Sequence, residues 1–547
     1  MRLKSPVLLS ALILLFLTAA ARAEHPADIV LHNGKIFTVD AGRPWAQAVA
    51  IRGSRIVAVG NDGPVRALAG PHTRSIDLGG RVVVPGFNDS HSHLGVGFPR
   101  LTLPPINIPG PGPTLQQALD QVAQAVAAAV PGEWILAFVG DAVILDPGAN
   151  RLVLDPVAPD NPVALITWSS HSAVINTRAM AAAGIAQTQP NPFGGSYDRF
   201  PGTNVVNGVI NEYALFGLVR AVRAEVPDEA LRAQFEAFTG LIAQVGFTSV
   251  QEMTIGLTRE RSERILAGAQ LKVRLRSMCV PMAVNESCRS TLFDPTDRLT
   301  SGGTKWILDG TPVERSAALR QPYADYPSTG RFNPTLSELS RIVQQGLFGL
   351  PVRDQLLFHA FGDRALDNLL GELDRSAPDF IWRLLRPRIE HGDMLQPGQI
   401  DKARRLGAIV VQNPTHFTLE LEPSLGPSRA AAAQPLRSLL DNGVRLAFGS
   451  DSPQPNPFVD LFFAVVHPFH PQEALTMEEA VTAYTRGSAT AEFQEWQKGS
   501  IKPGYLADLA VLSQDIFTIP PPAVPATVSV LTLVGGEAVW DAGVLAP

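Results

Sequence analysis

Two histidines separated by one residue follow an apolar run near position 90. The run Val82-Val83-Val84-Pro85-Gly86-Phe87 leads into Asn88-Asp89-Ser90-His91-Ser92-His93. Because side chains at positions i and i+2 lie on the same face of a strand, both imidazoles can reach one ion. Imidazole nitrogen is a common ligand of Zn²⁺ in proteins. Two surface histidines would give the same short pattern, so its meaning depends on the polar residues that other strands bring beside it.

Three further residues of ligand type also end apolar runs. His359 closes Leu356-Leu357-Phe358-His359, His391 closes Arg388-Ile389-Glu390-His391, and Asp451 closes Leu446-Ala447-Phe448-Gly449-Ser450-Asp451. Each one alone is typical of a capped or solvent-bonded strand end. In a barrel of parallel strands, however, the carboxyl ends meet on one rim. Four histidines and one aspartate on that rim predict a site for one or two divalent ions, with Zn²⁺ favoured.

A lysine begins another apolar run. Lys305 opens Lys305-Trp306-Ile307-Leu308-Asp309-Gly310. An inward-pointing lysine is costly to bury unless it is paired or modified, and the alternative is a lysine that reaches solvent. Two neighbouring cations need a bridging anion, which a carbamate formed from the lysine amine and CO₂ would supply. A binuclear site therefore predicts a carbamylated Lys305.

The middle of the chain alternates strand-like and helix-like patterns, as expected for a parallel sheet built from βα units. Helical stretches such as 336–345, 365–373 and 436–442 fall between the candidate strands. Eight such units predict a TIM-type (β/α)8 barrel of the α/β class, whose active site lies at the carboxyl ends of its strands. The eight candidate strands are 81–87, 248–252, 273–280, 304–309, 355–361, 386–390, 408–412 and 445–449.

Both chain ends are rich in strand-like segments and turn pairs. Asn33-Gly34 and Gly53-Ser54 predict hairpins near the beginning. About 150 residues separate the first two barrel candidates, which is too long for one βα connection. We therefore expect a β-sandwich domain from both ends and an inserted α+β subdomain after the first barrel strand. The predicted division is 24–80 and 498–547 for the sandwich, 81–97 for the first barrel strand with the metal motif, 98–235 for the insert, and 236–497 for the rest of the barrel.

The first residues have the features of a secretory signal peptide. Arg2 and Lys4 precede an apolar run that ends at the small-residue site Ala21-Arg22-Ala23. Residues 1–23 are therefore expected to be removed, leaving an exported protein, periplasmic or extracellular, with no stable membrane insertion. An uncleaved anchor helix is the alternative. Export also makes a Cys279–Cys288 disulfide feasible, although the sequence favours two separate buried thiols, because Cys279 lies in an apolar run and Cys288 in a polar loop.

The composition and charge of the chain disfavour some classes of binding partner. With 45% hydrophobic and 18% charged residues, the 547-residue chain has the composition of a globular protein. The formal charge of −6 and the absence of a basic block disfavour nucleic acid as a partner. The expected partner is a small-molecule substrate, and the sequence leaves a homodimer open.

Taken together, these motifs resemble the amidohydrolase superfamily of metal-dependent hydrolases, in the branch called amidohydrolase family 3, which includes formamide deformylases. The resemblance implies that His91 and His93 are first-strand ligands and that Lys305 is the carboxylated bridging lysine. It also implies that His359, His391 and Asp451 are the ligands of strands five, six and eight. The resembling segments are 28–40, 85–93, 131–185, 246–253, 304–315, 359–370, 388–394, 448–453 and 498–509.

The sequence departs from that branch in two places. It has Ser169-Ser170-His171 where Asp-Gly-His is usual, and Val250-Gln251-Glu252 where Val-His-Asp is usual. Neither departure removes an expected ligand, but both alter residues near the expected pocket.

The expected reaction is hydrolysis of a non-peptide C–N bond, such as an amide, an N-formyl group or a cyclic amide, by water that the metal activates. Asp451 is expected to take the proton of that water and deliver it to the leaving amine. His171 is expected to help polarise the carbonyl, although a buried structural role fits it equally. The alternatives are an esterase, lactonase or phosphotriesterase at the same centre, or a non-catalytic exported binding protein on this scaffold. The candidate substrate-binding residues are His171, Glu212, Arg315 and His416.

Overall fold

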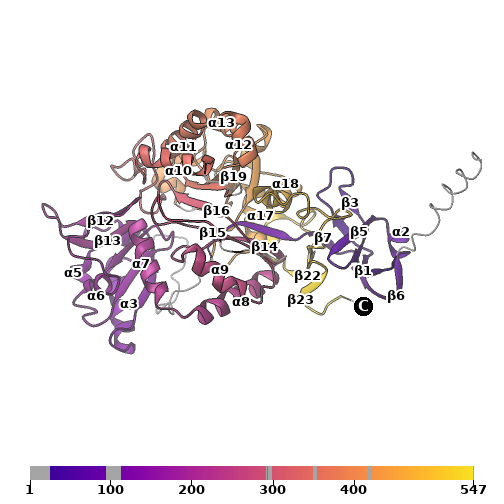
Figure 1. Ribbon diagram of the computed structural model, residues 1–547, viewed down its shortest axis with the longest axis horizontal. Coiled ribbons are helices and arrows are strands. Elements are labelled where there is room, and N and C mark those ends of the chain that lie inside the picture. Colours follow the sequence, from indigo (N-terminus) through magenta and orange to yellow (C-terminus); the bar gives the residue numbers. More distant parts are fainter. Residues whose placement is uncertain are drawn as a thin grey trace, which may run out of the picture.

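The computed structural model describes residues 25–93, 112–290, 292, 298–348, 354–416 and 420–545. In Figure 1 the molecule is elongated, with the inserted subdomain at one end, a barrel in the middle and the sheets of the N-terminal segment at the other end. The expected signal peptide, residues 1–23, lies outside the described residues. Among the helices of the described residues, none is long and apolar enough to cross a bilayer.

The middle part is one sheet of eight parallel strands in the order β20-β19-β18-β17-β16-β15-β14-β8. The two end strands of that order meet near their carboxyl ends, where the Asp451 N–H donates to the His91 carbonyl oxygen over 2.8 Å. The sheet is therefore a nearly closed barrel, which confirms the predicted TIM-type fold. Its strands are β8 (Phe87–Ser92), β14 (Phe247–Met253), β15 (Arg274–Cys279), β16 (Leu299–Ile307), β17 (Leu356–Ala360), β18 (Arg388–His391), β19 (Ile409–Gln412) and β20 (Arg445–Phe448).

The first barrel strand differs from its prediction. The run expected as one strand over 81–87 forms β7 (Val82–Pro85), which belongs to another sheet, and the barrel strand β8 begins only at Phe87. Gly86 lies at the change of sheet, where an added Cβ would come within 2.1 Å of the Thr248 side chain. Only a residue without a side chain fits this crossing. His91 thus lies within the barrel strand and His93 just beyond it.

Helices cover the outside of the barrel because each has one apolar face. In α11, for example, the buried residues Ala365, Leu366, Leu369, Leu370 and Leu373 recur at helical spacing. Figure 1 shows α10 to α13 above the barrel and α8 and α9 below it. These helices and those that follow are α8 (Asp228–Ala243), α9 (Arg259–Ala267), α10 (Leu336–Phe348), α11 (Asp363–Ser376), α12 (Asp379–Leu385), α13 (Pro397–Leu406), α14 (Leu421–Leu425), α15 (Pro427–Ala430), α16 (Leu436–Asp441), α17 (Pro457–Val466), α18 (Met477–Thr482) and α19 (Ser488–Ala491).

The insert between β8 and β14 is a five-stranded mixed sheet with helices on both faces. Adjacent residues of one strand face opposite layers: Ile135 packs with α3, and Leu136 packs with α6 and α7. Position 235, where the sequence placed the end of the insert, falls inside α8, whose buried Leu231 and Phe235 belong to the barrel core. The elements are α3 (Leu115–Ala128), β9 (Ile135–Val139), α4 (Asp141–Ile144), α5 (Arg151–Leu154), β10 (Val163–Thr167), β11 (Ser172–Ile175), α6 (Thr177–Ala182), β12 (Gly195–Arg199), β13 (Val206–Glu212) and α7 (Tyr213–Ala224).

The two chain ends contribute to two further sheets that share an apolar cluster. The hairpin predicted at Gly53-Ser54 is present between β4 and β5, but the one at Asn33-Gly34 was wrong, because β1 and β2 lie in different sheets. The four-stranded sheet contains β1 (Ala27–His32), β4 (Ala48–Arg52), β5 (Arg55–Gly60) and β6 (Ala69–Asp77), with α2 (Asp62–Arg66) beside it. The six-stranded sheet contains β2 (Lys35–Phe37), β3 (Trp45–Ala46), β7, β21 (Leu509–Leu512), β22 (Ser529–Val534) and β23 (Glu537–Asp541).

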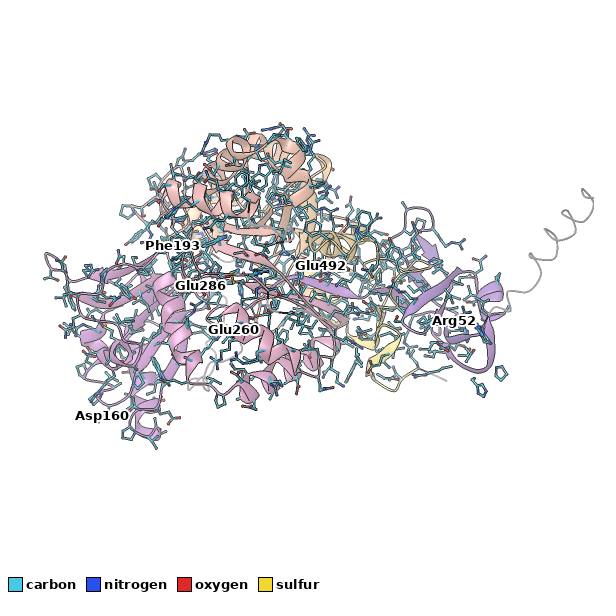
Figure 2. The ribbon with its side chains drawn as sticks, viewed as in Figure 1. Arg52, Asp160, Phe193, Glu260, Glu286 and Glu492 are labelled. Carbon is cyan, nitrogen blue, oxygen red and sulfur yellow. A yellow bond between two sulfur atoms is a disulfide. The ribbon has the colours of Figure 1, made fainter. Side chains whose placement is uncertain are left out.

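The loop after β15 is tied down at two points. Cys279 and Cys288 form a disulfide across it, with a Cα–Cα distance of 5.7 Å. Glu286, labelled in Figure 2, pairs with Arg220 of α7 through bonds of 2.8 and 3.1 Å. The loop therefore connects the barrel to the insert on the side where the barrel strands end.

Candidate metal centre

His91 and His93 direct one ring nitrogen each toward a common point. Their Nε2 atoms lie 3.2 Å apart. The other ring nitrogens are engaged: His91 Nδ1 lies 2.7 Å from Glu390 Oε2, and His93 Nδ1 lies 2.8 Å from the Met253 carbonyl oxygen. A carbonyl and a carboxylate oxygen both accept, so each Nδ1 carries the hydrogen. The two Nε2 lone pairs therefore face each other.

His391 brings a third imidazole in the same state. Its Nδ1 lies 2.9 Å from Asn413 Oδ1, and the amide nitrogen of Asn413 donates to the Gly449 carbonyl, which identifies the amide oxygen as the acceptor. Burial lowers the pKa of all three imidazoles, that of His93 to about 3. Three neutral rings that present lone pairs to one region repel one another unless a cation lies between them. These residues fit a divalent metal.

Asp451 supplies the carboxylate of this group. Its Oδ1 lies 3.7 Å from His91 Nε2 and 3.8 Å from His93 Nε2, and its Oδ2 lies 4.0 Å from His391 Nε2. Gly449 allows β20 to approach this closely, since an added Cβ would lie 2.5 Å from the His91 backbone nitrogen. His91, His391 and Asp451 offer ligand atoms within 4.8 Å of one another. The histidines and the aspartate that the sequence pattern singled out thus lie together as a compact group of nitrogen and oxygen ligands.

His359 and Lys305 border the same group. The His359 ring centroid lies 4.4 Å from that of His391, and its Nε2 lies 3.3 Å from the Gly310 carbonyl oxygen, which leaves Nδ1 as its remaining ring nitrogen. Lys305 Nζ lies 3.4 Å from His91 Nε2, and the side chain is 1% exposed. Burial lowers the pKa of Lys305 to about 8, which increases the fraction of neutral amine at neutral pH. All six expected ligand residues therefore lie together at one rim.

A second group shares His391 and includes Asp393 and His416, again with ligand atoms within 4.8 Å of one another. The rings of His391 and His416 are stacked, with centroids 4.6 Å apart and an interplanar angle of 23°. Ring lone pairs lie in the plane of each ring, so stacked rings do not direct them at one ion. His416 Nε2 instead lies 3.3 Å from Asp451 Oδ2. His416 therefore lies against the Asp451 carboxylate, as expected for a residue at the edge of the site.

The insert places a histidine and a glutamate over the barrel rim. His171 Nδ1 lies 2.8 Å from Glu212 Oε2, and the His171 ring centroid is 4.8 Å from that of His359. Burial disfavours a charge on His171, but the Glu212 carboxylate outweighs this effect and raises its pKa to about 9. The contact with Glu212 thus favours the protonated form of His171 and holds its ring beside His359 at the ligand cluster.

Arg315 does not face this cluster with a free guanidinium. Its Nη2 bonds Asp325 and lies 3.2 Å from Asp141 Oδ2, and its Nη1 donates to the carbonyl oxygens of Pro312 and Val313. These contacts brace the loop after β16 against the insert. Substrate binding by Arg315 stays a prediction that this geometry does not favour.

Five residues of the rim have positive φ without being glycine. Such backbone conformations cost on the order of 1–3 kcal/mol each and persist where the surrounding structure fixes them, often at functional sites. Two of them, His391 and Asp451, are expected ligands, so these side chains are held against the local backbone preference. The five are Ser170 (61°), Glu212 (54°), Arg315 (54°), His391 (72°) and Asp451 (46°).

Comparison with known families agrees with this ligand set. A model of the amidohydrolase family matches residues 74–540, from β6 to β23. The chain belongs to the amidohydrolase family. The resemblance drawn from the motifs is therefore confirmed at the level of the family.

Two relatives of this amidohydrolase align over nearly their whole lengths. Protein LONG AFTER FAR-RED 3 of Arabidopsis thaliana is 29% identical over 94% of this chain and 92% of its own. N-substituted formamide deformylase of Arthrobacter pascens is 28% identical over 89% of this chain and 94% of its own. In three dimensions, the crystal structure of an uncharacterized metal-dependent hydrolase from Pyrococcus horikoshii shares the fold, with a TM-score of 0.67 at 22% identity over 90% of this chain and 99% of that one.

Sequence reasoning missed the residues that hold the ligands. Glu390, Asn413 and the Met253 carbonyl orient three of the histidines. Asp309 accepts the N–H groups of Ala318, Phe361 and Gly362 and lies 3.7 Å from His359 Nε2. A signal was available for Glu390, because Arg388 and Glu390 are two charges at i and i+2 in an apolar barrel strand.

Proposed function

We propose that this amidohydrolase is an exported enzyme that hydrolyses a non-peptide C–N bond of a small molecule, such as an amide, an N-formyl group or a cyclic amide. The observation that carries the proposal is the convergence of three neutral imidazole Nε2 atoms on the Asp451 carboxylate, beside Lys305 and below the His171 donor. The deformylase relative supports a C–N bond as the target.

The ligands would be His91, His93, Lys305, His359, His391 and Asp451, holding one or two divalent ions, with Zn²⁺ as the first choice for imidazole and carboxylate groups. A bound divalent cation polarises a substrate carbonyl and lowers the pKa of water at the site. With two ions, a carbamate on Lys305 would supply the anionic ligand that offsets their mutual repulsion.

The remaining steps belong to side chains at the rim. Asp451 accepts the proton of the attacking water and returns it to the departing amine. His171, held by Glu212, donates a hydrogen bond to the carbonyl oxygen as negative charge develops there. His416 lies against Asp451 on the side away from His91 and His93 and limits where that carboxylate can turn.

Export is part of the proposal and rests on residues 1–23 of the sequence. A Cys279–Cys288 disulfide is suited to an oxidising compartment. Mass measurement of the native purified protein should give a mature chain that starts at Glu24. An intact Met1 in that protein would contradict export by this route.

The activity is tested on metal-free protein reconstituted separately with Zn²⁺, Mn²⁺ and Fe²⁺. Each form is assayed against matched pairs that differ only in the bond to be broken: an amide and an ester of one acid, a formamide and a formate ester of one substituent, and a lactam and a lactone of one ring size. We expect metal-dependent turnover of at least one C–N substrate. Turnover of esters or lactones alone would overturn the proposed bond specificity, and tight metal binding without any turnover would favour a binding protein.

A further inference from the structure

A buried ion pair lies directly behind the first metal ligand. Arg388 and Glu390 belong to β18, and their side chains, like that of His91, are 0% exposed. Arg388 Nε lies 2.7 Å from Glu390 Oε1, and Arg388 Nη2 lies 2.9 Å from Oε2. The same Oε2 accepts the hydrogen of His91 Nδ1 at 2.7 Å. One carboxylate oxygen thus joins the guanidinium to the ligand ring.

Arg388 also holds the backbone beside His91. Its Nη2 donates to the Ser90 carbonyl oxygen over 2.7 Å, and its Nη1 donates to Gln251 Oε1 over 2.6 Å. The guanidinium therefore uses its planar donors on three partners at once: the Glu390 carboxylate, Gln251 of β14 and the Ser90 carbonyl of β8. Neither β14 nor β8 is adjacent to β18 in the barrel, so these contacts reach across it. This geometry fixes both the ring and the main chain of the ligand.

The contacts continue to the far end of the barrel. Gln251 Nε2 lies 3.4 Å from Asn88 Oδ1, and Asn88 Nδ2 donates to Glu492 Oε1 over 2.7 Å. Glu492, labelled near the centre of Figure 2, also pairs with Lys498 at 2.7 Å. A row of buried polar side chains thus runs from the segment after α19 to the ligand.

We propose that Arg388 and Glu390 are positioning residues of the metal centre, with Gln251 as the brace of Arg388. The pair keeps the hydrogen of His91 on Nδ1 and holds the ring so that Nε2 faces His93. This inference rests on the proposed metal centre and goes beyond it, because neither residue contacts the expected ion or the substrate.

Folding stability alone does not explain why the Arg388–Glu390 pair is buried behind His91. A buried ion pair is often no more stable than well-packed apolar residues of similar volume, whereas removal of one partner leaves an uncompensated charge and is strongly destabilising. A carboxylate behind a ligating histidine fixes the tautomer and orientation of the ring, and loss of such a partner commonly lowers metal affinity about 10–100-fold. Removing both charges together therefore separates the contribution of the pair to folding stability from its contribution to metal affinity.

The test compares the double variant R388M/E390M with the single variants E390M and R388M. Two quantities are measured on metal-free protein: the Zn²⁺ dissociation constant, by competition with a chromophoric chelator, and the melting temperature, by circular dichroism. We expect each single variant to melt well below wild type and the double variant to recover most of that loss. Zn²⁺ affinity should stay about 10–100-fold below wild type in the double variant.

A matched control is the buried pair Arg274–Asp508, whose Nε–Oδ2 distance is 2.8 Å. It lies at the amino end of β15, whereas the expected ligands lie at the carboxyl ends of the strands. R274M/D508M should leave Zn²⁺ affinity within about two-fold of wild type. A second probe, Gln251→Leu, keeps Glu390 on His91 and removes one acceptor from Arg388, together with the Gln251 Nε2 contacts to Asn88 and to the Ser488 carbonyl oxygen. A few-fold loss of Zn²⁺ affinity is expected for it even if the double variant does not fold.

Recovery of wild-type Zn²⁺ affinity together with stability in R388M/E390M would overturn the inference and leave the pair a purely structural role. Unchanged affinity in Gln251→Leu would overturn the role of the brace. If wild-type protein itself binds no Zn²⁺, the metal centre fails and the inference fails with it, so the two failures are distinguishable.

Discussion

The Nε2 atoms of His91 and His93 lie 3.2 Å apart, although each ring uses its Nδ1 hydrogen on a different acceptor. Two lone pairs at this distance are unfavourable without a cation between them. The relationship follows from the i, i+2 spacing at the carboxyl end of β8, and it turns a short sequence pattern into a chelating pair.

The first prediction concerns His93, whose replacement leaves fewer buried groups unpaired than replacement of His91. His93→Ala should lose bound metal and lower hydrolytic activity by more than about 100-fold, above the cost of losing an outer partner of a ligand. Metal analysis and circular dichroism are measured on the same sample. His72→Ala, at an exposed position of β6, is the control and should behave as wild type. Full activity in His93→Ala would remove this residue from the ligand set.

The second prediction concerns Lys305. In a binuclear site, Lys305→Ala should lose at least one metal ion and most activity, because the anion between the two cations is missing. Added formate or acetate should restore part of both, since a small carboxylate can occupy the space that the side chain leaves. An unmodified lysine, found by intact mass in a fully active and metal-loaded enzyme, would favour a mononuclear site in which Lys305 has only an electrostatic role.

Some elements of the fold could be predicted from the sequence and others could not. The barrel strands were predictable because they are buried on both faces and end in polar residues, as around His359, His391 and Asp451. A special role for Lys305 was predictable because burying a charged side chain in an apolar run is costly unless it is paired or modified. The prediction of one barrel strand over 81–87 was wrong, because this continuous apolar run contributes to two different sheets. The division lies at Gly86, between β7 and β8.

Residues that act through another residue were harder to find. Asn413 and Asp309 follow or end strands without a distinctive spacing, and their role depends on which ring they meet in space. The Met253 contact uses a carbonyl oxygen and leaves no trace in residue type. Arg315 was a substrate-binding candidate because its segment resembles a loop of the family, and Asp141 and Asp325 engage its guanidinium. Its contact with substrate stays a prediction.

The third prediction concerns the disulfide. Cys279 and Cys288 are separated by nine positions, and closing a loop of that length stabilises the folded state by about 2–3 kcal/mol on chain-entropy grounds. C279A/C288A should therefore melt at a lower temperature than wild type. Dithiothreitol should lower the melting temperature of wild type toward that of the variant and leave the variant unchanged. Equal melting temperatures with and without reductant in wild type would argue against the bond.

The fourth prediction concerns pH and the pair between α16 and α18. Hydrogen bonds from Arg437 are the main cause that lowers the pKa of Glu479 from 4.5 to about 2. A carboxyl whose pKa is depressed in the folded state contributes stability above its unfolded pKa and loses it as pH falls toward the folded one. Glu479→Gln retains the helix cap but not the charge. The melting-temperature gap between wild type and this variant should therefore shrink as pH falls from 4.5 to 2.

Glu478 is the matched control, because it lies in the same first turn of α18 and is exposed. Glu478→Gln removes a charge from the same turn without touching the Arg437 contact, so the comparison isolates the effect of that contact. A gap for Glu479→Gln that stays constant or widens toward pH 2 would contradict the assigned role of the Arg437 contact.

In the proposed metal centre, His91, His93, His391 and Asp451 surround a divalent ion. The most direct measurement is anomalous diffraction at the zinc edge from crystals of the active, zinc-loaded protein. A peak about 2.0–2.1 Å from the Nε2 atoms of His91 and His93 is the expected result. A zinc-loaded, active protein with no peak there, or with its only peak between Asp393 and His416, would contradict the account.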